Sequence, residues 1–590
     1  MNLGKQLWES MTTEQNFTEK ISLFISRSNI STELNKTGSW RFVRPTYHEK
    51  TAPCSAACPA GEDIARIEML SSQGRYREAL EAILLENPFP AVCGRVCFHR
   101  CETVCNRSGL DEPIAIHRIE RFVGDTAAKD NATFSLEKLP HNGKKICIVG
   151  AGPSGLAAAY FLTRLGYSCD VFEAQTEPGG ILRWGIPRYR LPEAVLNAEI
   201  QRIKNLGVKI ICNTRATQNF LENARDRYHA FFIGCGHGRS LKMNIPGENI
   251  AIDGLDFLNR MRTGKTEPLK KKTAAVIGGG NTAIDVARSL VRLGVKAILV
   301  YRRRKQDMPA FESEVETAVK EGVKIMELLS PSSIAPDDGE YVLTLQPMKP
   351  GRMETDTGRA RVVPDGEITQ TLRVQRIFTA IGAEPSEPWQ LPSEENADIV
   401  HFSHCAFMPN NPPFLFGGDL TNPTKSVADA IASGKQSAMA LDTFFKKGMN
   451  AISERLNSCL VGNGPALSME RFMDGKRSSR NPEMVSYEDI NVDYFSPAPR
   501  IETESLSLNE QMNPFDEIET TFTRHQVSQE TRRCFNCGIC NGCDNCRIFC
   551  PEVAVSFQDD RRRINLDYCK GCGICVVECP RNAMALEVEV

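Results

Sequence analysis

The sequence predicts a multidomain α/β protein with a helical, cysteine-rich N-terminal domain, two nested Rossmann-like dinucleotide-binding domains and a small cysteine-rich C-terminal domain. Three observations lead to this prediction. The chain has 590 residues, more than one hydrophobic core normally contains. Two glycine-rich strand–turn–helix patterns, GAGPSG and GGGNTA, lie in its middle part. Of its 22 cysteines, six fall between Cys54 and Cys105 and ten between Cys534 and Cys579.

The overall composition argues against a nucleic-acid partner and against a membrane protein. The formal net charge is -2 and charges of both signs are interspersed, so no basic face is expected. The N-terminus, MNLGKQLWESMTTEQNF, is polar, and no apolar run approaches the roughly 18 residues that a spanning helix needs. We therefore expect a soluble cytoplasmic protein without membrane insertion, whose clustered cysteines bind metal or iron–sulfur clusters instead of forming disulfides.

Residues 1–45 are predicted to form a polar arm of no assigned function, and residues 46–140 a helical cysteine domain. The cysteines of this domain are Cys54, Cys58, Cys93, Cys97, Cys101 and Cys105. Zinc would bind four such thiolates, and buried structural cysteines are a further alternative. Six thiols with repeated three-residue gaps and a Cys-Pro step favour an iron–sulfur cluster.

The first glycine pattern lies in KKICIVGAGPSGL, where a short apolar strand runs into a tight turn and an Ala-rich helix. Gly150, Gly152 and Gly155 would bring backbone N–H groups to the pyrophosphate of a dinucleotide at the helix N-terminus. The next strand ends at Glu173, where a carboxylate can accept hydrogen bonds from a ribose. Residues 141–265 are therefore predicted to be the first part of one dinucleotide-binding domain.

The second glycine pattern, at residues 278–283, predicts a second dinucleotide-binding domain over residues 266–374. The strand after it ends in a run of arginines instead of an acid: Arg302, Arg303 and Arg304. Arginines pair with the 2′-phosphate of NADP, whereas an acidic residue accepts from the 2′-hydroxyl of NAD. The run favours NADP(H) over NAD(H); a solvated face is the alternative.

Residues 375–450 are expected to return to the first domain and complete it. RIFTAIGAEP is a predicted strand with a turn at Gly382, and FLFGGDL is a predicted strand that ends at Gly418 and Asp419. Asp419 is placed to bond a ribityl hydroxyl of a flavin, or it only caps a turn. The helix that opens near Ser426 would stabilise an anionic reduced flavin with its N-terminus.

The C-terminal part begins with residues 451–530, which are polar and predicted to be an extended linker. Residues 531–590 are predicted to be a bacterial-type ferredoxin domain with two 4Fe-4S clusters, because in such CxxCxxCxxxCP runs the fourth thiolate crosses to the other cluster. The predicted ligands are Cys540, Cys543, Cys546, Cys550, Cys569, Cys572, Cys575 and Cys579. Cys534 and Cys537 remain as extra or competing ligands.

These motifs in this order resemble a known family. A cysteine domain with CGRVC followed by KICIVGAGPSGL is similar to the small subunit of NADPH-dependent glutamate synthase, the N-terminal half of dihydropyrimidine dehydrogenase and the large subunit of the bifurcating NADH-dependent ferredoxin:NADP oxidoreductase. The resemblance covers about residues 40–450 and implies FAD in the first dinucleotide site and NAD(P)H in the second. With the glycine patterns, it implies these cofactor contacts: Gly150, Gly152, Pro153, Ser154, Gly155, Glu173, Gly180, Leu182, Gly278, Gly280, Asn281, Thr282, Arg302, Arg303, Gly382, Gly418, Asp419, Ser426 and Val427.

The resembling family usually carries two 4Fe-4S clusters in its N-terminal domain, with a first motif CxxCxxxxCxxxCP. This sequence keeps only the last two cysteines of that motif, so at least one N-terminal cluster is expected. The ligands that the resemblance implies are Cys58, Cys97, Cys101 and Glu120. The alternative for Glu120 is a solvent-facing helix carboxylate. Cys54, Cys93 and Cys105 are left as structural residues or as part of an incomplete second site.

The predicted activity is that of an NAD(P)H:acceptor oxidoreductase, which exchanges a hydride between NAD(P)H and FAD and single electrons through 4Fe-4S clusters. No catalytic side chain is required, because the protein only orients the two rings. The six cysteines between the two clustered groups form no CxxC or CxxxxC pair, so electrons are not expected to leave through a dithiol.

The added ferredoxin domain and the segment GSWRFVRP resemble the flavoproteins that serve dissimilatory sulfite reductase in sulfur metabolism. The expected partner is a protein electron acceptor or donor, either ferredoxin-like or linked to sulfite reductase, with the chain acting as a homo-oligomer or a complex subunit. Alternatives are a ferredoxin:NADP oxidoreductase subunit of oxoacid or aromatic degradation, a glutamate synthase small-subunit-like protein, and a non-catalytic electron-wiring subunit.

Overall fold

The computed structural model describes residues 36–129, 136–265, 272–353, 360–367, 369–391, 398–473, 480–503, 516–558 and 561–589. The chain divides into two compact units, the larger formed by residues 47–543 and 579–584 and the smaller by residues 1–46, 544–578 and 585–590. Most of the predicted N-terminal arm, residues 1–35, lies outside the described residues. None of the helices in the described ranges combines the length and apolarity that crossing a bilayer requires.

The first dinucleotide fold of the larger unit is built on a seven-stranded sheet with five parallel strands and an antiparallel edge. Its strands, in spatial order, are β17 (Val400–His401), β18 (Cys405–Met408), β19 (Phe414–Gly417), β5 (Ala230–Ile233), β2 (Lys145–Val149), β3 (Ser168–Phe172) and β4 (Lys209–Ile211). The segments from residue 400 onward pair beside β5, so the chain does return to the first domain late, as the nested order predicts.

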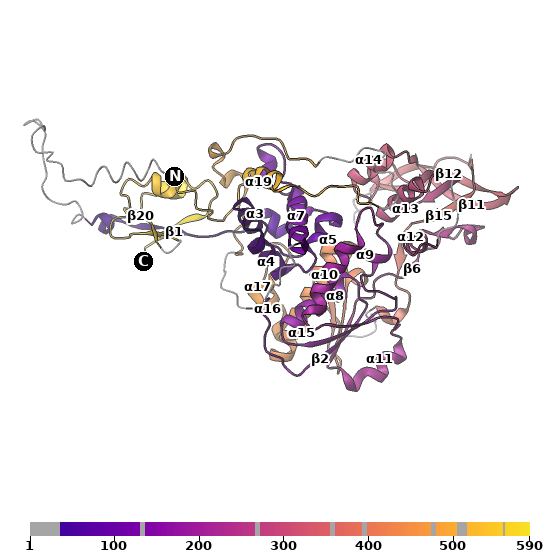
Figure 1. Cartoon of the computed structure of the whole chain (residues 1–590), viewed down its shortest axis with the longest axis horizontal. Coiled ribbons are helices and arrows are strands. Elements are labelled where there is room, and N and C mark those ends of the chain that lie inside the picture. The colour runs from indigo at the N-terminus through magenta and orange to yellow at the C-terminus, as the bar shows by residue number, and fades with distance from the viewer. Residues whose placement is uncertain are drawn as a thin grey trace, which may run out of the picture. The chain divides into compact units, whose positions relative to one another are not determined.

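Helices cover both faces of this sheet because alternate residues of β2 point to opposite sides. Ile146 and Ile148 pack into one core with α8, α10 and α15, whereas Cys147 and Val149 pack into a second core with α11. Figure 1 shows α8, α10 and α15 on one side of β2 and α11 on the other. The helices are α8 (Pro153–Arg164), α10 (Glu193–Asn205), α11 (Gln218–Ala224) and α15 (Val427–Lys447).

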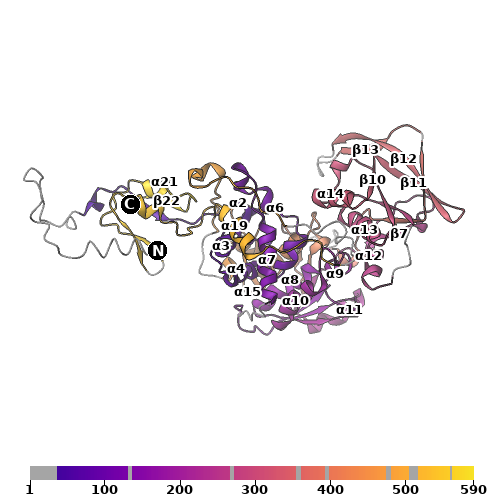
Figure 2. The same ribbon diagram turned by 45° about the horizontal axis from the view of Figure 1, so that its top comes forward.

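The second dinucleotide fold is a five-stranded parallel sheet with an antiparallel sheet inserted in the chain between β10 (Lys324–Glu327) and β15 (Arg376–Thr379); both are visible in Figure 2. The parallel strands, in spatial order, are β10, β9 (Lys296–Tyr301), β8 (Thr273–Ile277), β15 and β7 (Ile252–Asp253). The antiparallel strands are β11 (Leu329–Asp337), β12 (Glu340–Met353), β13 (Ala360–Pro364) and β14 (Gln370–Val374). Helix α13 (Asn281–Arg292) packs on β9 in the core of the parallel sheet.

This topology differs from the predicted division of the chain at residues 265 and 375. The segment Arg376–Thr379, predicted to return to the first domain, forms β15 and pairs in parallel with β8 and β7 of the second. Strand β7 and helix α12 (Gly254–Arg262), predicted in the first domain, also belong to the second. The difference arises because a short apolar strand suits either sheet, and only long-range pairing decides between them.

The predicted helical cysteine domain consists of six helices. They are α2 (Pro53–Ala57), α3 (Ile64–Ser72), α4 (Tyr76–Glu86), α5 (Pro90–Val96), α6 (Arg100–Thr103) and α7 (Ile116–Lys129). Helices α3, α4 and α7 surround an apolar core, whereas α5 packs into the core of the first dinucleotide fold. Proline opens both α2 and α5, where the missing N–H costs no helical hydrogen bond. Cys58 and Cys97 lie in extended backbone where these two helices end, so both helices present a thiol at their C-terminal ends.

The predicted extended linker is partly helical and packs against the rest of the larger unit. In the described part it contains α16 (Ile452–Asn457), α17 (Met469–Phe472) and α19 (Arg524–Arg533). Arg480 pairs with the buried Glu86 at 2.8 Å, and Arg533 pairs with Asp111 at 3.0 Å. The prediction of an extended linker was wrong for these segments, because α16 and α17 bury apolar side chains in the core and ion pairs hold the residues near Arg480 and Arg533.

The smaller unit contains the hairpin β20 (Val555–Gln558) and β21 (Arg561–Ile564), with the short helices α20 (Asn545–Ile548) and α21 (Ile574–Val577). The end of the predicted arm is part of this fold: β1 (Val43–Tyr47) pairs with β22 (Met584–Val588). Arg41 donates to both carboxylate oxygens of Glu589 at 2.6 Å. The start and the end of the described chain are therefore held together.

A buried ion pair joins the two dinucleotide folds of the larger unit. Arg190, in the loop before α10, donates to both carboxylate oxygens of Asp285 on α13 at 2.9 Å. The two side chains are 7% and 4% exposed, and Glu314 lies 3.3 Å from Arg190. A charge-assisted, two-point contact of this kind restricts how one fold can rotate on the other.

We expect Arg190→Ala to lower the free energy of local opening of α13 in the second dinucleotide fold, because the substitution leaves Asp285 buried without its partner. Removing one member of a buried pair costs about 3–5 kcal/mol. Hydrogen exchange of the α13 amides should report a loss of that order in local opening free energy. Arg239→Ala is the control: its pair with Glu384 is 62% and 42% exposed, and such pairs contribute less than about 1 kcal/mol. Equal effects of the two substitutions would contradict the assignment.

Glu199 of α10 caps a helix of the cysteine domain and is fully buried. It accepts from the backbone N–H groups of Ala91 and Val92 at 2.8 and 3.2 Å, at the start of α5. Burial raises the pKa of Glu199 to about 7. The folded protein therefore keeps a proton that the unfolded chain has already lost, and stability falls as the pH rises from about 4.5 to about 7.

The pH dependence of unfolding should isolate this carboxyl group when wild type is compared with Glu199→Gln. Relative to the variant, the wild-type free energy of unfolding should fall between pH 5 and 7 by an amount on the order of 3 kcal/mol. Urea unfolding of the holoprotein at several pH values measures it. Glu454→Gln, at an exposed position of α16, is the control. Parallel pH profiles for wild type and Glu199→Gln would refute the assignment.

Candidate functional site

The first glycine turn has a backbone shape that requires glycine. Gly150 has φ of +97°, in the region that side chains disfavour. A Cβ atom on Gly155 would collide with the carbonyl oxygen of Gly150, and one on Gly180 would lie 2.7 Å from the Cα atom of Gly152. The turn therefore brings backbone segments close together directly before α8, which begins at Pro153.

Ser154 provides a test of whether a dinucleotide fits this turn. Its hydroxyl oxygen is buried, and among the described residues it has no hydrogen-bond partner. It lies in the first turn of α8, and a Cβ on Gly418 would lie 2.9 Å from the Ser154 Cβ. A buried donor without a partner at a helix N-terminus suits a phosphate oxygen. The predicted contacts Gly152, Ser154, Gly180 and Gly418 thus converge, and they fit the pyrophosphate of FAD.

Glu173 lies where β3 ends, beside the turn, as predicted. Its two carboxylate oxygens accept from the backbone N–H groups of Ala151 and Gln175 at 2.8 and 2.9 Å. These bonds fix the carboxylate, and each oxygen retains a lone pair for a ribose hydroxyl. Leu182, in α9 (Ile181–Trp184), is only 1% exposed and its side chain packs in the core. Any contact of Leu182 with a cofactor would therefore be made by its backbone.

The N-terminus of α15 lies next to the predicted flavin contact Asp419. Ser426 caps this helix by accepting from the N–H of Asp429 at 3.1 Å, and Val427 is its buried first residue. The Gly418 N–H donates to the hydroxyl of Ser433 at 2.8 Å, which fixes the turn before Asp419. Burial raises the pKa of the Asp419 carboxyl. The arrangement offers a carboxyl group and a helix N-terminus to the same ligand.

The second glycine turn repeats the geometry of the first. Gly278 has φ of +144°, and Gly280 precedes α13, which starts at Asn281. The Asn281 side-chain oxygen accepts from the N–H of Phe311 at 3.1 Å, so this side chain holds the following loop. Thr282 is half-buried in the first turn of the helix. Gly382 lies between β15 and the short strand β16 (Ala383–Glu384), two residues after Ala380, whose carbonyl oxygen would collide with a Cβ atom on Gly278.

The arginine run follows β9 at the edge where the second turn lies. Arg304 is engaged by Asp307, at 2.8 Å. Arg302 is exposed and, within the described ranges, makes no ion pair, whereas Arg303 is half-buried. Arg302 is therefore the member of the run best placed to meet a phosphate from solvent.

The four predicted N-terminal ligands come together in the cysteine domain. Cys58 and Cys97 lie at the ends of α2 and α5, Cys101 lies in α6, and Glu120 lies in α7. The charge of Cys97 contributes to raising the pKa of both Cys58 and Glu120, after burial, which is the largest cause. Glu120 is 8% exposed, so the alternative of a solvent-facing carboxylate is wrong. The ligand roles remain predictions.

A second buried carboxylate, Glu62, was not predicted from the sequence. The side-chain amide of Asn87 donates to Glu62 at 2.6 Å and to Glu120 at 3.1 Å, so the two carboxyl groups share one donor. Burial is the largest cause that raises the pKa of both carboxyl groups, and the charge of Glu62 raises the pKa of Glu120 further. Glu62 stands in the loop CPAGED with no pattern around it, so nothing in the sequence distinguishes it.

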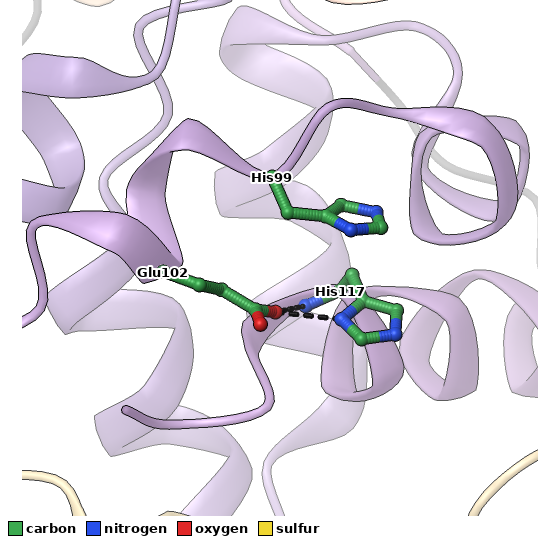
Figure 3. Close-up of side chains that lie close together, drawn as sticks. All are labelled: His99, Glu102 and His117. Atoms are coloured by element: carbon green, nitrogen blue, oxygen red, sulfur yellow. Dashed lines mark hydrogen bonds and ion pairs between the residues drawn. The ribbon is translucent and has the colours of Figure 1, made fainter. Parts of the chain in front are cut away.

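Beside Cys101 lies a group that resembles a metal site, His99, Glu102 and His117, shown in Figure 3. The carboxylate of Glu102 lies 2.6 Å from His117 Nδ1, and its other oxygen accepts from Arg500 at 2.6 Å. The His99 ring stacks on that of His117 with 4.1 Å between centroids. Since Arg500 already neutralises Glu102, we assign this group the structural task of tying α6 to α7 and to the C-terminal segment.

The ferredoxin motif of the smaller unit gathers four of its predicted ligands around one cavity. Cys550 lines that cavity together with Cys569, Cys572 and Cys575. This is the crossed arrangement that the paired motifs predict, three thiols from one run and one from the other. Of the remaining predicted ligands, Cys546 is buried in the smaller unit, and Cys540, Cys543 and Cys579 belong to the larger one.

All 22 cysteines are described, and none forms a disulfide. Cys147, Cys169, Cys405 and Cys459 are buried in the dinucleotide folds and belong to no pair. Burial raises the pKa of Cys169 and of Cys405 to about 12, so neither is a thiolate near neutral pH. That no dithiol accompanies the flavin stays a prediction.

Three family profiles match the chain. Pyridine nucleotide-disulphide oxidoreductase matches residues 144–403, dihydropyrimidine dehydrogenase domain II with a 4Fe-4S cluster matches residues 46–132, and the 4Fe-4S binding domain matches residues 562–585. The matches agree with the fold class and with the predicted FAD, NAD(P)H and 4Fe-4S cofactors. The protein is accordingly an α/β flavoprotein with one iron–sulfur domain before and one after its dinucleotide folds in the sequence.

Several curated proteins are similar to this chain over most of its length. The NADP(+)-dependent formate dehydrogenase subunit beta of Moorella thermoacetica is 32% identical over 519 residues, which cover 82% of this chain and 70% of that protein. The NADPH-Fe(3+) oxidoreductase subunit beta of Geobacter sulfurreducens is 30% identical, with coverages of 82% and 75%. The NAD-dependent dihydropyrimidine dehydrogenase subunit PreT of Salmonella typhimurium is 32% identical, with coverages of 67% and 92%. The chain therefore belongs to this family of NAD(P)H-dependent FAD oxidoreductases with 4Fe-4S clusters.

Proposed function

We propose that this chain passes electrons between NAD(P)H and a protein partner, and that the partner is the dissimilatory sulfite reductase system. The observation that supports this electron path is the ion pair between Arg100 and Asp429, at 2.9 Å. Arg100 precedes the predicted ligand Cys101, and Asp429 lies in the first turn of α15, beside the predicted flavin contacts. The cysteine domain is thereby attached to the flavin fold at the point where electrons would leave the flavin.

In this proposal the residues of the chain hold the two dinucleotides, FAD and NAD(P)H, at fixed positions. Bound FAD supplies the exchange of one hydride, two electrons, from NAD(P)H for two single electrons, with NAD(P)⁺ and a proton as the other products. The turns at Gly150 and Gly278 hold the two dinucleotides, and the Arg190–Asp285 pair fixes the relative position of the two folds. Orientation of this kind is what hydride transfer requires of a protein.

The sulfite reductase partner is supported by a resemblance at both ends of the chain. The segment GSWRFVRP and the added ferredoxin domain are similar to the DsrL flavoprotein of dissimilatory sulfur metabolism. Two of the similar proteins are named as beta subunits, of a formate dehydrogenase and of an NADPH-Fe(3+) oxidoreductase. We therefore also propose that this chain acts as a subunit of a complex of several proteins.

Anaerobic reconstitution tests the proposed function directly. After iron and sulfide are incorporated and counted, NADPH or NADH is added while the flavin and cluster absorbances are followed. We expect rapid bleaching, and reoxidation when purified dissimilatory sulfite reductase is supplied. Bleaching that only a ferredoxin reverses would replace the partner and keep the activity. A sample with FAD and iron that neither nucleotide bleaches would leave a non-catalytic wiring subunit.

Arg302→Ala should separate NADPH from NADH. A charge-assisted bond to the 2′-phosphate contributes about 1.5–3 kcal/mol, so KM for NADPH should rise about 10- to 100-fold while KM for NADH stays nearly constant. Steady-state assays with an artificial one-electron acceptor measure both constants. Lys296→Ala, at an exposed position at the start of the same strand β9, is the matched control. Equal changes for both nucleotides would contradict the preference for NADP(H).

A further inference from the structure

We propose that Cys54, Cys105, Cys534 and Cys537 together bind a further 4Fe-4S cluster, whose ligands come from opposite ends of the chain. All four lie in the larger unit, although more than 400 residues separate the two pairs. The inference goes beyond the proposed function, because it concerns a metal site that can be counted without turnover and without a partner.

Hydrogen bonds hold the loop with Cys534 and Cys537 against the segment that contains Cys105. The side-chain amide of Asn106, the next residue, donates to the sulfur of Cys537 at 3.5 Å. Arg107 donates to the carbonyl oxygen of Arg533, the residue before Cys534, at 2.8 Å. The side chain of Arg533 in turn pairs with Asp111 at 3.0 Å. Because these contacts are buried or partly buried, the position of the loop is fixed by the fold.

Cys54 approaches the same loop from α2. Ala52, Phe535, Cys537 and Ile539 form one buried apolar group, and Cys54 packs against it. The Asn536 side chain donates to the carbonyl oxygen of Ala65 at 3.2 Å, and the Lys50 N–H donates to the carbonyl oxygen of Gly538 at 2.9 Å. Gly538 has φ of +74°, and a Cβ there would collide with that same backbone. Residues on both sides of Cys54 are thereby bonded to the loop.

The four thiols lie close enough to affect one another's ionisation. Burial raises the pKa of Cys54 well above its usual value, and the charges of Cys105, Cys537 and Cys534 raise it further. Burial and Cys105 likewise raise the pKa of Cys537 to about 12. Without a metal these thiols keep their protons near neutral pH. Metal ions that bind them displace the protons and stabilise the thiolate form.

The surroundings suit an anionic cluster. The Asn536 N–H points at the Cys534 sulfur at 3.4 Å, a bond of the kind that tunes cluster ligands. The guanidinium groups of Arg107 and Arg533 are 1% and 5% exposed and supply buried positive charge. Glu68, only 1% exposed, has no hydrogen-bond partner for either carboxyl oxygen among the described residues, and burial raises the pKa of this carboxyl group well above its usual value. A neutral carboxyl group without a partner fits a site whose ligand lies beside it.

The spacing of the sulfurs favours a cluster over a single zinc ion. Zinc–sulfur bonds of about 2.3 Å in a tetrahedron put the sulfurs about 3.8 Å apart. Across the part of the chain that the structure describes, no three cysteine sulfurs lie within 4.8 Å of one another. In a 4Fe-4S cluster each cysteine binds a separate iron, so its four sulfurs are farther apart.

The proposed site would connect the N-terminal ligands with the ferredoxin ligands. Cys54 and Cys58 are one helical turn apart on α2, where the Cys58 N–H donates to the Cys54 carbonyl at 3.2 Å. At the other end, Cys537 precedes Cys540 by three residues, a chain length of at most about 11 Å. One electron could thus pass from a neighbouring cluster, which is oxidised, to this one, which is reduced, without transfer of atoms.

Iron counting on Cys534→Ser/Cys537→Ser tests the proposal. With the three predicted clusters, the wild type should hold about sixteen irons per FAD and the double variant about twelve. The dithionite-reduced variant should also lose the electron paramagnetic resonance intensity of one cluster. Cys54→Ser and Cys105→Ser should each reduce or alter the same signal. Cys405→Ser/Cys459→Ser, a double substitution of buried cysteines outside all these groups, should keep the wild-type count.

An unchanged iron count in Cys534→Ser/Cys537→Ser would overturn the proposal. If that variant loses FAD and fails to fold, anomalous diffraction from wild-type crystals at the iron and zinc edges decides. Iron among these four sulfurs supports the proposal, whereas zinc or no metal there overturns it. Flavin bleaching by NADPH serves as a separate measurement, so loss of the proposed function can be told apart from loss of this site.

Discussion

One buried carboxylate, that of Glu86, holds together the parts of the protein that an electron must cross. It accepts from Lys435 of α15 at 2.7 Å, from Arg480 at 2.8 Å and from the hydroxyl of Ser468 at 2.6 Å. Burial alone would raise the pKa of Glu86, but Lys435 and Arg480 hold it below its usual value. Because Glu86 ends α4, the cysteine domain, the flavin fold and the C-terminal segment meet at one charge.

Other charged side chains also join parts of the larger unit, in one case as a buried ion pair, Arg190–Asp285. Glu199 joins the flavin fold to α5, Arg100 joins α6 to α15, and Arg190 joins the flavin fold to the second dinucleotide fold. Buried ion pairs add little net stability compared with apolar packing of the same volume, but they are costly to separate or to misalign. They therefore suit a protein in which cofactors held by different domains must keep fixed separations.

The C-terminal segment shows how such contacts bring distant cysteines together. Glu530 accepts from the backbone N–H groups of Ala115 and Ile501, each at 2.9 Å, and Arg533 pairs with Asp111. These contacts precede Cys534 and fix its approach to the cysteine domain.

The sequence by itself determined the features that depend on local backbone geometry. The turns at Gly150 and Gly278, the strand that ends at Glu173 and the helix that opens at Ser426 are found where they were predicted. Each follows from steric or hydrogen-bonding rules that act over a few residues. The paired cysteine runs are of the same kind, because each run supplies three closely spaced ligands to one cluster.

Only the tertiary structure decided which distant segments meet. The strand Arg376–Thr379 could have joined either sheet, and the burial of Glu62 beside Glu120 has no counterpart in the local sequence. The proximity of Cys534 and Cys537 to Cys105 depends on bonds made by Asn106 and Arg107 across more than 400 residues. Such contacts carry no periodic pattern, because a single buried polar pair leaves only two isolated residues in the sequence.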